Sequence, residues 1–141
     1  MLIIGYGNRE RGDDGAGVLV AEQLRELGIP TKIHTADALA LIELWGGVEE
    51  VTLIDAVVTG APAGTVHKWD VDQMLGAEAS HASSHGMGLV QAIGLARSLG
   101  CLPGQLHLYG IEGKRFAIGQ EMSTEVKNAV ERLVRQIAEP S

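Results

Sequence analysis

Apolar and polar residues alternate along the chain in two ways, one typical of strands and one typical of helices. Apolar runs or strict alternation predict strands at residues 2–6, 32–35, 51–58, 65–71 and 106–109. Apolar residues recur every three or four positions elsewhere, which predicts helices over residues 13–27, 39–45, about 89–96 and 123–137. Strands and helices therefore follow one another along the chain, which is typical of an α/β domain.

The residues at the helix ends support these boundaries. Gly28 and Pro30 are expected to end the first helix, because glycine and proline commonly terminate helices. Ser123 is expected to cap the last helix, since a serine hydroxyl can accept a hydrogen bond from its first amides. The small or apolar residues expected on one helix face are Gly17, Val20, Leu24 and Leu27 in the first helix and Val126, Val130, Leu133 and Ile137 in the last.

Length and composition fit one globular domain that spans residues 1–141. With 45% hydrophobic residues, the chain can bury a core. Its apolar runs fall short of the roughly 20 residues that cross a bilayer, and no charged start precedes an apolar signal core, so we expect a cytoplasmic protein without a membrane partner. The single cysteine, Cys101, excludes an internal disulfide and a cysteine-based zinc cluster, and we expect it to be a small buried residue.

The charge of the chain narrows the range of partners. Eleven basic and 18 acidic residues give a net charge of −7. A phosphate backbone requires a basic face, so nucleic acid is not an expected partner. An acidic surface still permits a basic protein partner.

The most distinctive segment follows the first predicted strand, where glycines surround two adjacent carboxylates. Residues 5–17 read GYGNRERGDDGAG. Glycine lets a backbone turn sharply and lets a ligand come close. A phosphate would be held by bare amides and often a lysine, whereas Asp13 and Asp14 repel it and attract a cation. This loop is therefore interpreted as a metal site, with Asp13 the better candidate for capping the following helix.

Another carboxylate lies inside the most apolar predicted strand. Asp55 follows Leu53 and Ile54, so we expect it to be buried and to meet a metal ion, an arginine or a cluster of donors. Ligands gather at the carboxyl ends of strands in open α/β sheets, so Asp14 and Asp55 are expected at one edge. The alternative is that Asp55 caps the following turn through its own backbone.

Two histidines precede a predicted helix. Residues 81–89 read HASSHGMGL, and a neutral imidazole in this segment can bind metal. In a helix His81 and His85 would share a face, but Gly86 and Gly88 favour a loop that enters a helix. His85 is then the better ligand candidate, and His81 is more simply an exposed loop residue. Three further histidines fall in or beside strands and have no acidic ligand partner nearby in sequence, and we interpret them as structural: His34, His67 and His107.

Oxygen and nitrogen ligands without thiolate suit a divalent ion such as nickel, zinc or manganese. The sequence lacks the signatures of other hydrolases: it has no Gly-x-Ser-x-Gly elbow, no His-Glu-x-x-His helix and no convincing histidine partner for Cys101. The start Gly5-x-Gly7 resembles a dinucleotide fingerprint, but Glu10 occupies the position of its third glycine.

Taken together, three separated motifs closely resemble the hydrogenase maturation endopeptidases. They are Gly5-Tyr6-Gly7-Asn8 with Asp13-Asp14-Gly15-Ala16-Gly17-Val18, then Leu53-Ile54-Asp55-Ala56, and finally Ser84-His85-Gly86-Met87-Gly88-Leu89. The likeness spans most of the chain. Members of this family remove a short C-terminal extension from the large subunit of a nickel–iron hydrogenase after its nickel has been installed.

The resemblance implies a three-layer, flavodoxin-like (phosphorylase/hydrolase-like) α/β fold with a mostly parallel central sheet flanked by helices. It also implies a hydrolase, a metal-dependent endopeptidase of the aspartic type, whose partner is the large-subunit precursor. Carried over by position, the family's metal-contacting trio falls on Asp14, Asp55 and His85, which are also the expected catalytic residues. Nickel is the expected metal, carried by the substrate rather than held permanently. Glu112 is expected to line the site.

Two departures from the family pattern stand out. Residues 37–41 read DALAL where many members carry a Gly-Gly-Thr segment thought to help select the large subunit, so the sequence leaves the cognate hydrogenase open. Gly113 replaces the usual proline after Gly-Ile-Glu, which is expected to leave that loop more mobile.

Two other functions fit fewer of these observations. One is a nickel-dependent chaperone that docks on the immature subunit without cutting it. The other is a nucleotide- or flavin-binding domain of the same fold, since one fold can host many activities.

Overall fold

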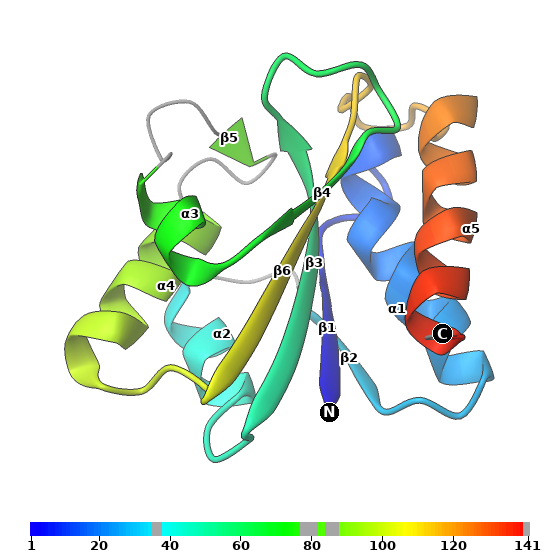
Figure 1. Ribbon diagram of the computed structural model, residues 1–141. Helices are drawn as coiled ribbons and strands as arrows, with labels where there is room; N and C mark the ends of the chain where they lie inside the picture. The colour runs from blue at the N-terminus through cyan, green and yellow to red at the C-terminus, as the bar shows by residue number, and fades with distance from the viewer. Residues whose placement is uncertain (35–37, 77–81, 84–87, 140–141) are drawn as a thin grey trace.

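The strands of the chain form one sheet between two layers of helices (Figure 1). The computed structural model describes residues 1–34, 38–76, 82–83 and 88–139. The strands are β1 (Leu2–Tyr6), β2 (Thr31–His34), β3 (Glu50–Val58), β4 (Val66–Trp69), β5 (Ala82–Ser83) and β6 (Gln105–Glu112). The helices are η1, a short 3₁₀ helix (Gly12–Gly15), then α1 (Ala16–Glu26), α2 (Ala38–Leu44), α3 (Val71–Gly76), α4 (Gly88–Leu99) and α5 (Thr124–Ala138).

The sheet is mostly parallel, with the strand order β2-β1-β3-β6-β4. β2, β1, β3 and β6 run in the same direction, whereas β4 is antiparallel to β6 and β5 is antiparallel to the end of β3. The connections β1–α1, β3–β4 and β6–α5 therefore all leave from the end of the sheet where the parallel strands have their carboxyl ends, at the top of Figure 1. We call this end the carboxyl edge of the sheet. The expected three-layer α/β fold is confirmed, and this edge is where its strands end.

Each face of the sheet has its own core. α1 and α5 cover one face, and α2, α3 and α4 cover the other (Figure 1). Successive residues of a strand point to opposite faces, so Leu53 packs in the core beneath α2 and α4, whereas Ile54 packs in the core beneath α1 and α5. By the same alternation Asp55 lies on the face of Leu53. Among the described residues, no helix combines the length and apolarity needed to cross a membrane.

Several local expectations prove wrong. The first helix begins at Ala16 rather than near residue 13, because residues 12–15 form η1. Leu27 lies past the end of α1 and is 61% exposed, so it does not continue the buried face of Gly17, Val20 and Leu24. Cys101 is exposed rather than buried, because it lies in the connection from α4 to β6, outside both cores.

Gly17 allows the first helix to pack directly on the backbone of the sheet. A Cβ atom at this position would lie 2.2 Å from the carbonyl oxygen of Ile54 and 2.8 Å from that of Tyr6. Only a residue without a side chain fits such an approach. The start of α1, and η1 before it, are therefore held against the ends of β1 and β3.

Gly17→Ala is expected to lower the free energy of unfolding by about 2 kcal/mol, because the added methyl group collides with strand backbone that cannot move alone. Urea denaturation measures this loss. Gly46→Ala is the matched control, since a Cβ there would have no neighbour closer than 3.5 Å and Gly46 is not among the glycines with positive φ. Equal losses in the two variants would contradict the close-packing argument.

Candidate functional site

Asp14 lies in η1, between β1 and α1, and is completely buried. Its Oδ2 accepts a hydrogen bond from the Asn8 amide (3.1 Å), and its backbone carbonyl accepts a longer one from the same amide (3.3 Å). The turn η1 contacts β3, which carries the next candidate residue. Asp14 is therefore placed at the carboxyl edge of the sheet, beside β3.

Asp55 is also completely buried, as its apolar surroundings in the sequence indicated. Its Oδ1 accepts a hydrogen bond from the adjacent Ala56 amide (2.8 Å). The alternative in which Asp55 caps a following turn is wrong, because β3 continues to Val58. β1 pairs with β3 as far as Gly5 opposite Ile54. Asp55 therefore lies on β3 at the level where β1 gives way to the loop that carries Asp14.

His85, the third predicted ligand, lies outside the described residues, as does His81. The nearest described residues on either side of His85 are Ser83, which pairs with Val57 of β3, and Gly88, where α4 begins. Among the described residues, no group of three or more His, Cys, Asp or Glu side chains is arranged to hold a metal ion. A metal centre that includes Asp14 and Asp55 therefore needs a ligand from the rest of the chain or from a bound substrate.

Asp13, next to Asp14, has a structural role that the sequence did not reveal. Its buried carboxylate accepts hydrogen bonds from the amides of Lys114 (2.8 Å), Arg115 (2.9 Å) and Ser123 (2.7 Å), and from the Ser123 hydroxyl (3.0 Å). Its own amide donates to the Arg115 carbonyl (2.7 Å). Asp13 therefore ties η1 to the loop after β6 and to the start of α5.

Two capping expectations change as a result. Asp13 does not cap the first helix, whose N-cap is Gly15. Ser123 does occupy the N-cap position of α5, but its hydroxyl makes no capping bond to the helix and donates to Asp13 instead. The buried carboxylate of Asp13 competes for this hydroxyl, because a charged acceptor makes a stronger hydrogen bond than a neutral one.

Gly113 has a packing role. Its amide donates to the Val57 carbonyl (3.1 Å). A Cβ at this position would lie 2.7 Å from the Phe116 ring and 2.9 Å from the Cβ of Asp13. Close packing, and not only loop mobility, therefore explains why a glycine occupies position 113.

A second buried carboxylate network lies at the same edge, around Glu112 at the end of β6. Glu112 is 2% exposed. Its Oε1 accepts hydrogen bonds from the Thr59 hydroxyl (2.6 Å) and from Nε2 of His67 (3.1 Å), and its Oε2 accepts one from the Thr59 amide (2.8 Å). Burial alone would raise the pKa of Glu112, but the hydrogen bonds from Thr59 and His67 outweigh it and hold the pKa below its ordinary value. Glu112 is therefore an ionised group that fixes the start of the β3–β4 connection.

The sequence did not reveal that His67 has a carboxylate partner. Glu112 is 45 residues away and comes within reach because β4 pairs with β6, which places His67 opposite Gly110. An ionised carboxylate can only accept, so Nε2 of His67 carries the proton of this hydrogen bond. His107 likewise contacts Glu50 on the neighbouring β3 (3.3 Å). The sequence signal for this network was Glu112 itself, an acidic residue that follows an apolar segment.

Comparisons with known proteins identify a matching family, similar chains and a similar fold. A family model described as hydrogenase maturation protease matches residues 35–140. Protein FrxA of Pyrococcus furiosus is 29% identical over 89% of this chain and 93% of its own length, and a putative hydrogenase maturation protease of Methanocaldococcus jannaschii is 26% identical over 97% and 93%. The structure of the [NiFe] hydrogenase maturation protease HybD from Thermococcus kodakarensis matches with a TM-score of 0.81 and 30% identity, covering 98% of this chain and 95% of that one.

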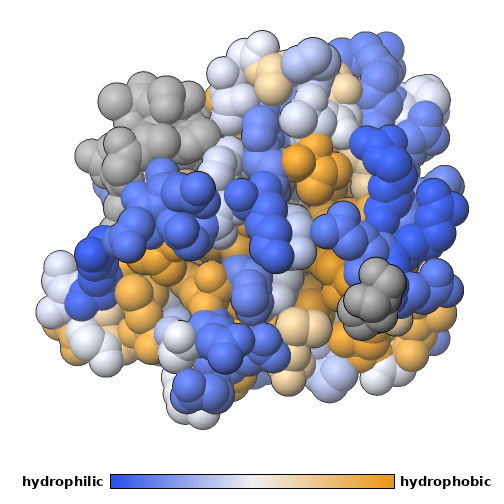
Figure 2. Space-filling model, in the orientation of Figure 1, coloured by the Kyte–Doolittle hydropathy of each residue, from blue (hydrophilic) through white to orange (hydrophobic). Residues whose placement is uncertain are grey.

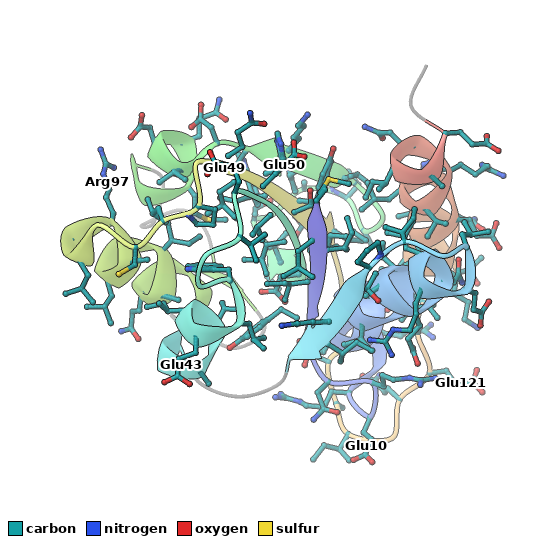
Figure 3. All side chains as sticks on the ribbon, turned by 90° about the horizontal axis from the view of Figure 1, so that it is seen from below. Glu10, Glu43, Glu49, Glu50, Arg97 and Glu121 are labelled. Atoms are coloured by element: carbon teal, nitrogen blue, oxygen red, sulfur yellow. The ribbon has the colours of Figure 1, made fainter. Side chains whose placement is uncertain are left out.

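Asp13→Asn is expected to lower the free energy of unfolding by about 2 to 4 kcal/mol, because its amide group turns a donor toward other donors in a buried network. Urea or thermal denaturation measures the change. Glu10→Gln is the control, since Glu10 is exposed in the same loop and points outward in Figure 3. If Asp13→Asn is no more destabilising than Glu10→Gln, Asp13 does not hold the loop.

Glu112 is expected to make stability depend on pH. Its folded pKa lies below the unfolded value of about 4.3, so its contribution is present above that pH and is lost as the pH falls through the folded pKa. Urea midpoints measured from about pH 6 downward should therefore fall less in Glu112→Gln than in the wild type. Glu50→Gln is the control, because Glu50 also contacts a histidine but has a side chain that is 39% exposed. If the urea midpoint of Glu112→Gln fell with pH as steeply as that of the wild type, the lowered pKa of Glu112 would be contradicted.

Proposed function

The chain belongs to the hydrogenase maturation protease family, and we propose that it is an endopeptidase that removes the C-terminal extension from the large-subunit precursor of a nickel–iron hydrogenase. The observation that carries this proposal is the pair of completely buried carboxylates, Asp14 and Asp55, at the carboxyl edge of the sheet. Ligands of open α/β folds bind at this edge. Buried carboxylates at this end of the sheet can serve as oxygen ligands of a divalent cation, which supports a substrate that brings one.

The cation in this proposal is nickel already installed in the precursor, contacted by Asp14, Asp55 and His85. Carboxylate and imidazole groups engage a nickel ion without the thiolates that would compete strongly with a sulfur-rich substrate site. Binding would then report that metal insertion is complete. Asp13 is not part of this group, because its carboxylate already serves the loop after β6.

The chemistry of cleavage would divide between the substrate and the chain. Nickel in the substrate is a Lewis acid that can polarise the scissile carbonyl or lower the pKa of a bound water. Asp14 and Asp55 supply carboxylates at this edge, and one of them can accept the proton of an attacking water. Both residues would also orient the nickel-bearing segment. These roles make the enzyme a metal-dependent endopeptidase of the aspartic type.

Asp14→Asn and Asp55→Asn are each expected to slow cleavage about 100-fold or more, because each removes a charge while keeping the shape of the side chain. Intact-mass measurements over time, on the nickel-loaded precursor with purified protein, detect loss of the C-terminal peptide. The same precursor without nickel is expected to keep its mass. Glu10→Gln, which alters an exposed residue of the same loop, should cut at the wild-type rate.

The possible results separate the parts of the proposal. Normal cleavage by Asp14→Asn would remove Asp14 from the trio. Cleavage of the nickel-free precursor would contradict recognition through nickel. A stable complex in which the precursor mass never changes would replace the peptidase with a chaperone that docks without cutting.

A further inference from the structure

Ile118, in the connection between β6 and α5, is the most exposed large apolar side chain among the described residues, at 81%. It lies at the tip of a turn in which the Gln120 amide donates to the Ala117 carbonyl (3.1 Å). Gly119 has a φ of +82°, and none of the described non-glycine residues has a positive φ. This combination defines a type II turn with Ile118 as its second residue.

Neither the turn nor the cores require isoleucine at this position. Proline is favoured at the second position of a type II turn, and small or polar residues dominate exposed turns in general. Ile118 belongs to neither hydrophobic core, although Phe116 and Met122 on either side pack against one of them. Neither the conformation of the turn nor the packing of the two cores accounts for an isoleucine at this position.

The turn that presents Ile118 is held firmly on both sides by the β1–α1 connection. The Gly119 amide donates to the Glu10 carbonyl (2.8 Å), and Nε of Arg11 donates to the Phe116 carbonyl (3.2 Å). Figure 3 shows Glu10 and Glu121 pointing outward on the same side of the molecule, from the two connections that meet there. A side chain on a fixed backbone can be buried by a partner at little cost in ordering.

The turn also lies beside the candidate site. Asp13, the neighbour of Asp14, accepts hydrogen bonds from the backbone at the start of the same loop. The next most exposed large apolar residues, Leu27 (61%) and Leu99 (60%), lie at the far ends of α1 and α4, at the opposite edge of the sheet (Figure 1). Ile118 is thus a strongly exposed apolar side chain at the edge where a substrate would approach Asp14.

We infer that Ile118 is a docking contact for the large-subunit precursor and inserts into an apolar recess of that subunit while Asp14 faces its nickel. The identity of the partner rests on the proposed function. On the face shown in Figure 2, polar side chains divide the apolar surface into separate areas, so that face offers no single continuous patch as a rival docking surface. Docking through the turn places the partner against the edge that carries Asp14.

The test compares how tightly the purified, nickel-loaded precursor binds to immobilised variants. Ile118→Asp is expected to raise the dissociation constant about tenfold or more, because an isoleucine buried at an interface contributes at least that much. Ile118→Val should bind like the wild type. Leu99→Asp is the matched control, an equally drastic change of an exposed apolar residue at the far edge, and should also bind normally. In cleavage assays Ile118→Asp should raise KM and leave kcat unchanged.

The melting temperatures of the variants should equal that of the wild type, and Ile118→Thr repeats the test with a β-branched polar residue in case aspartate disturbs the turn. The docking role would be overturned if Ile118→Asp bound the precursor as tightly as Leu99→Asp does. Ile118→Thr takes the place of Ile118→Asp in this comparison if aspartate disturbs the turn. Continued cleavage of the precursor in that case would leave the proposed function standing. A wild type that neither binds nor cuts the precursor would contradict the proposed function and the docking role together.

Discussion

The buried carboxylate of Asp13 holds the turn after β1 against the loop after β6, more than 100 residues later in the chain. An ionised carboxylate makes stronger hydrogen bonds than a neutral acceptor, and its burial is costly unless such bonds are complete. The backbone amides of Lys114, Arg115 and Ser123 complete them. Because Ser123 is the N-cap residue of α5, the same network sets where this helix starts, and α5 packs on α1 in the core on that face.

This arrangement explains how two adjacent carboxylates can have different roles. Successive residues of a 3₁₀ helix point about 120° apart, so Asp13 and Asp14 of η1 face different surroundings. Asp13 turns toward the loop after β6, whereas Asp14 is hydrogen-bonded to the Asn8 amide. Asp13 therefore stabilises the fold and Asp14 has the proposed chemical role, although the two residues are neighbours in one turn. A change that loosens Asp13 displaces Asp14 with it.

Much of this fold could be predicted from local patterns, but its polar networks could not. Apolar runs located the central strands, and two apolar residues before Asp55 were enough to indicate its burial. α3 was missed because six residues show too little periodicity to predict a helix. The partners of Asp13 and His67 depend on which strands and loops become neighbours, which no local pattern encodes. Of the proposed trio, two residues are buried at the expected edge, and His85 remains a prediction.

Both connections that flank the candidate site are fixed in the same way, since Glu112 holds the start of the β3–β4 connection as Asp13 holds the β6–α5 connection. In each case a buried, hydrogen-bonded carboxylate accepts backbone amides, so the start of each connection is anchored from the interior of the protein. The tip of the turn at Ile118 is therefore free to differ in chemistry without disturbing Asp14. The side chain at position 118 can then change to suit another partner, while the buried carboxylates of Asp13 and Glu112 that hold the two connections must stay the same.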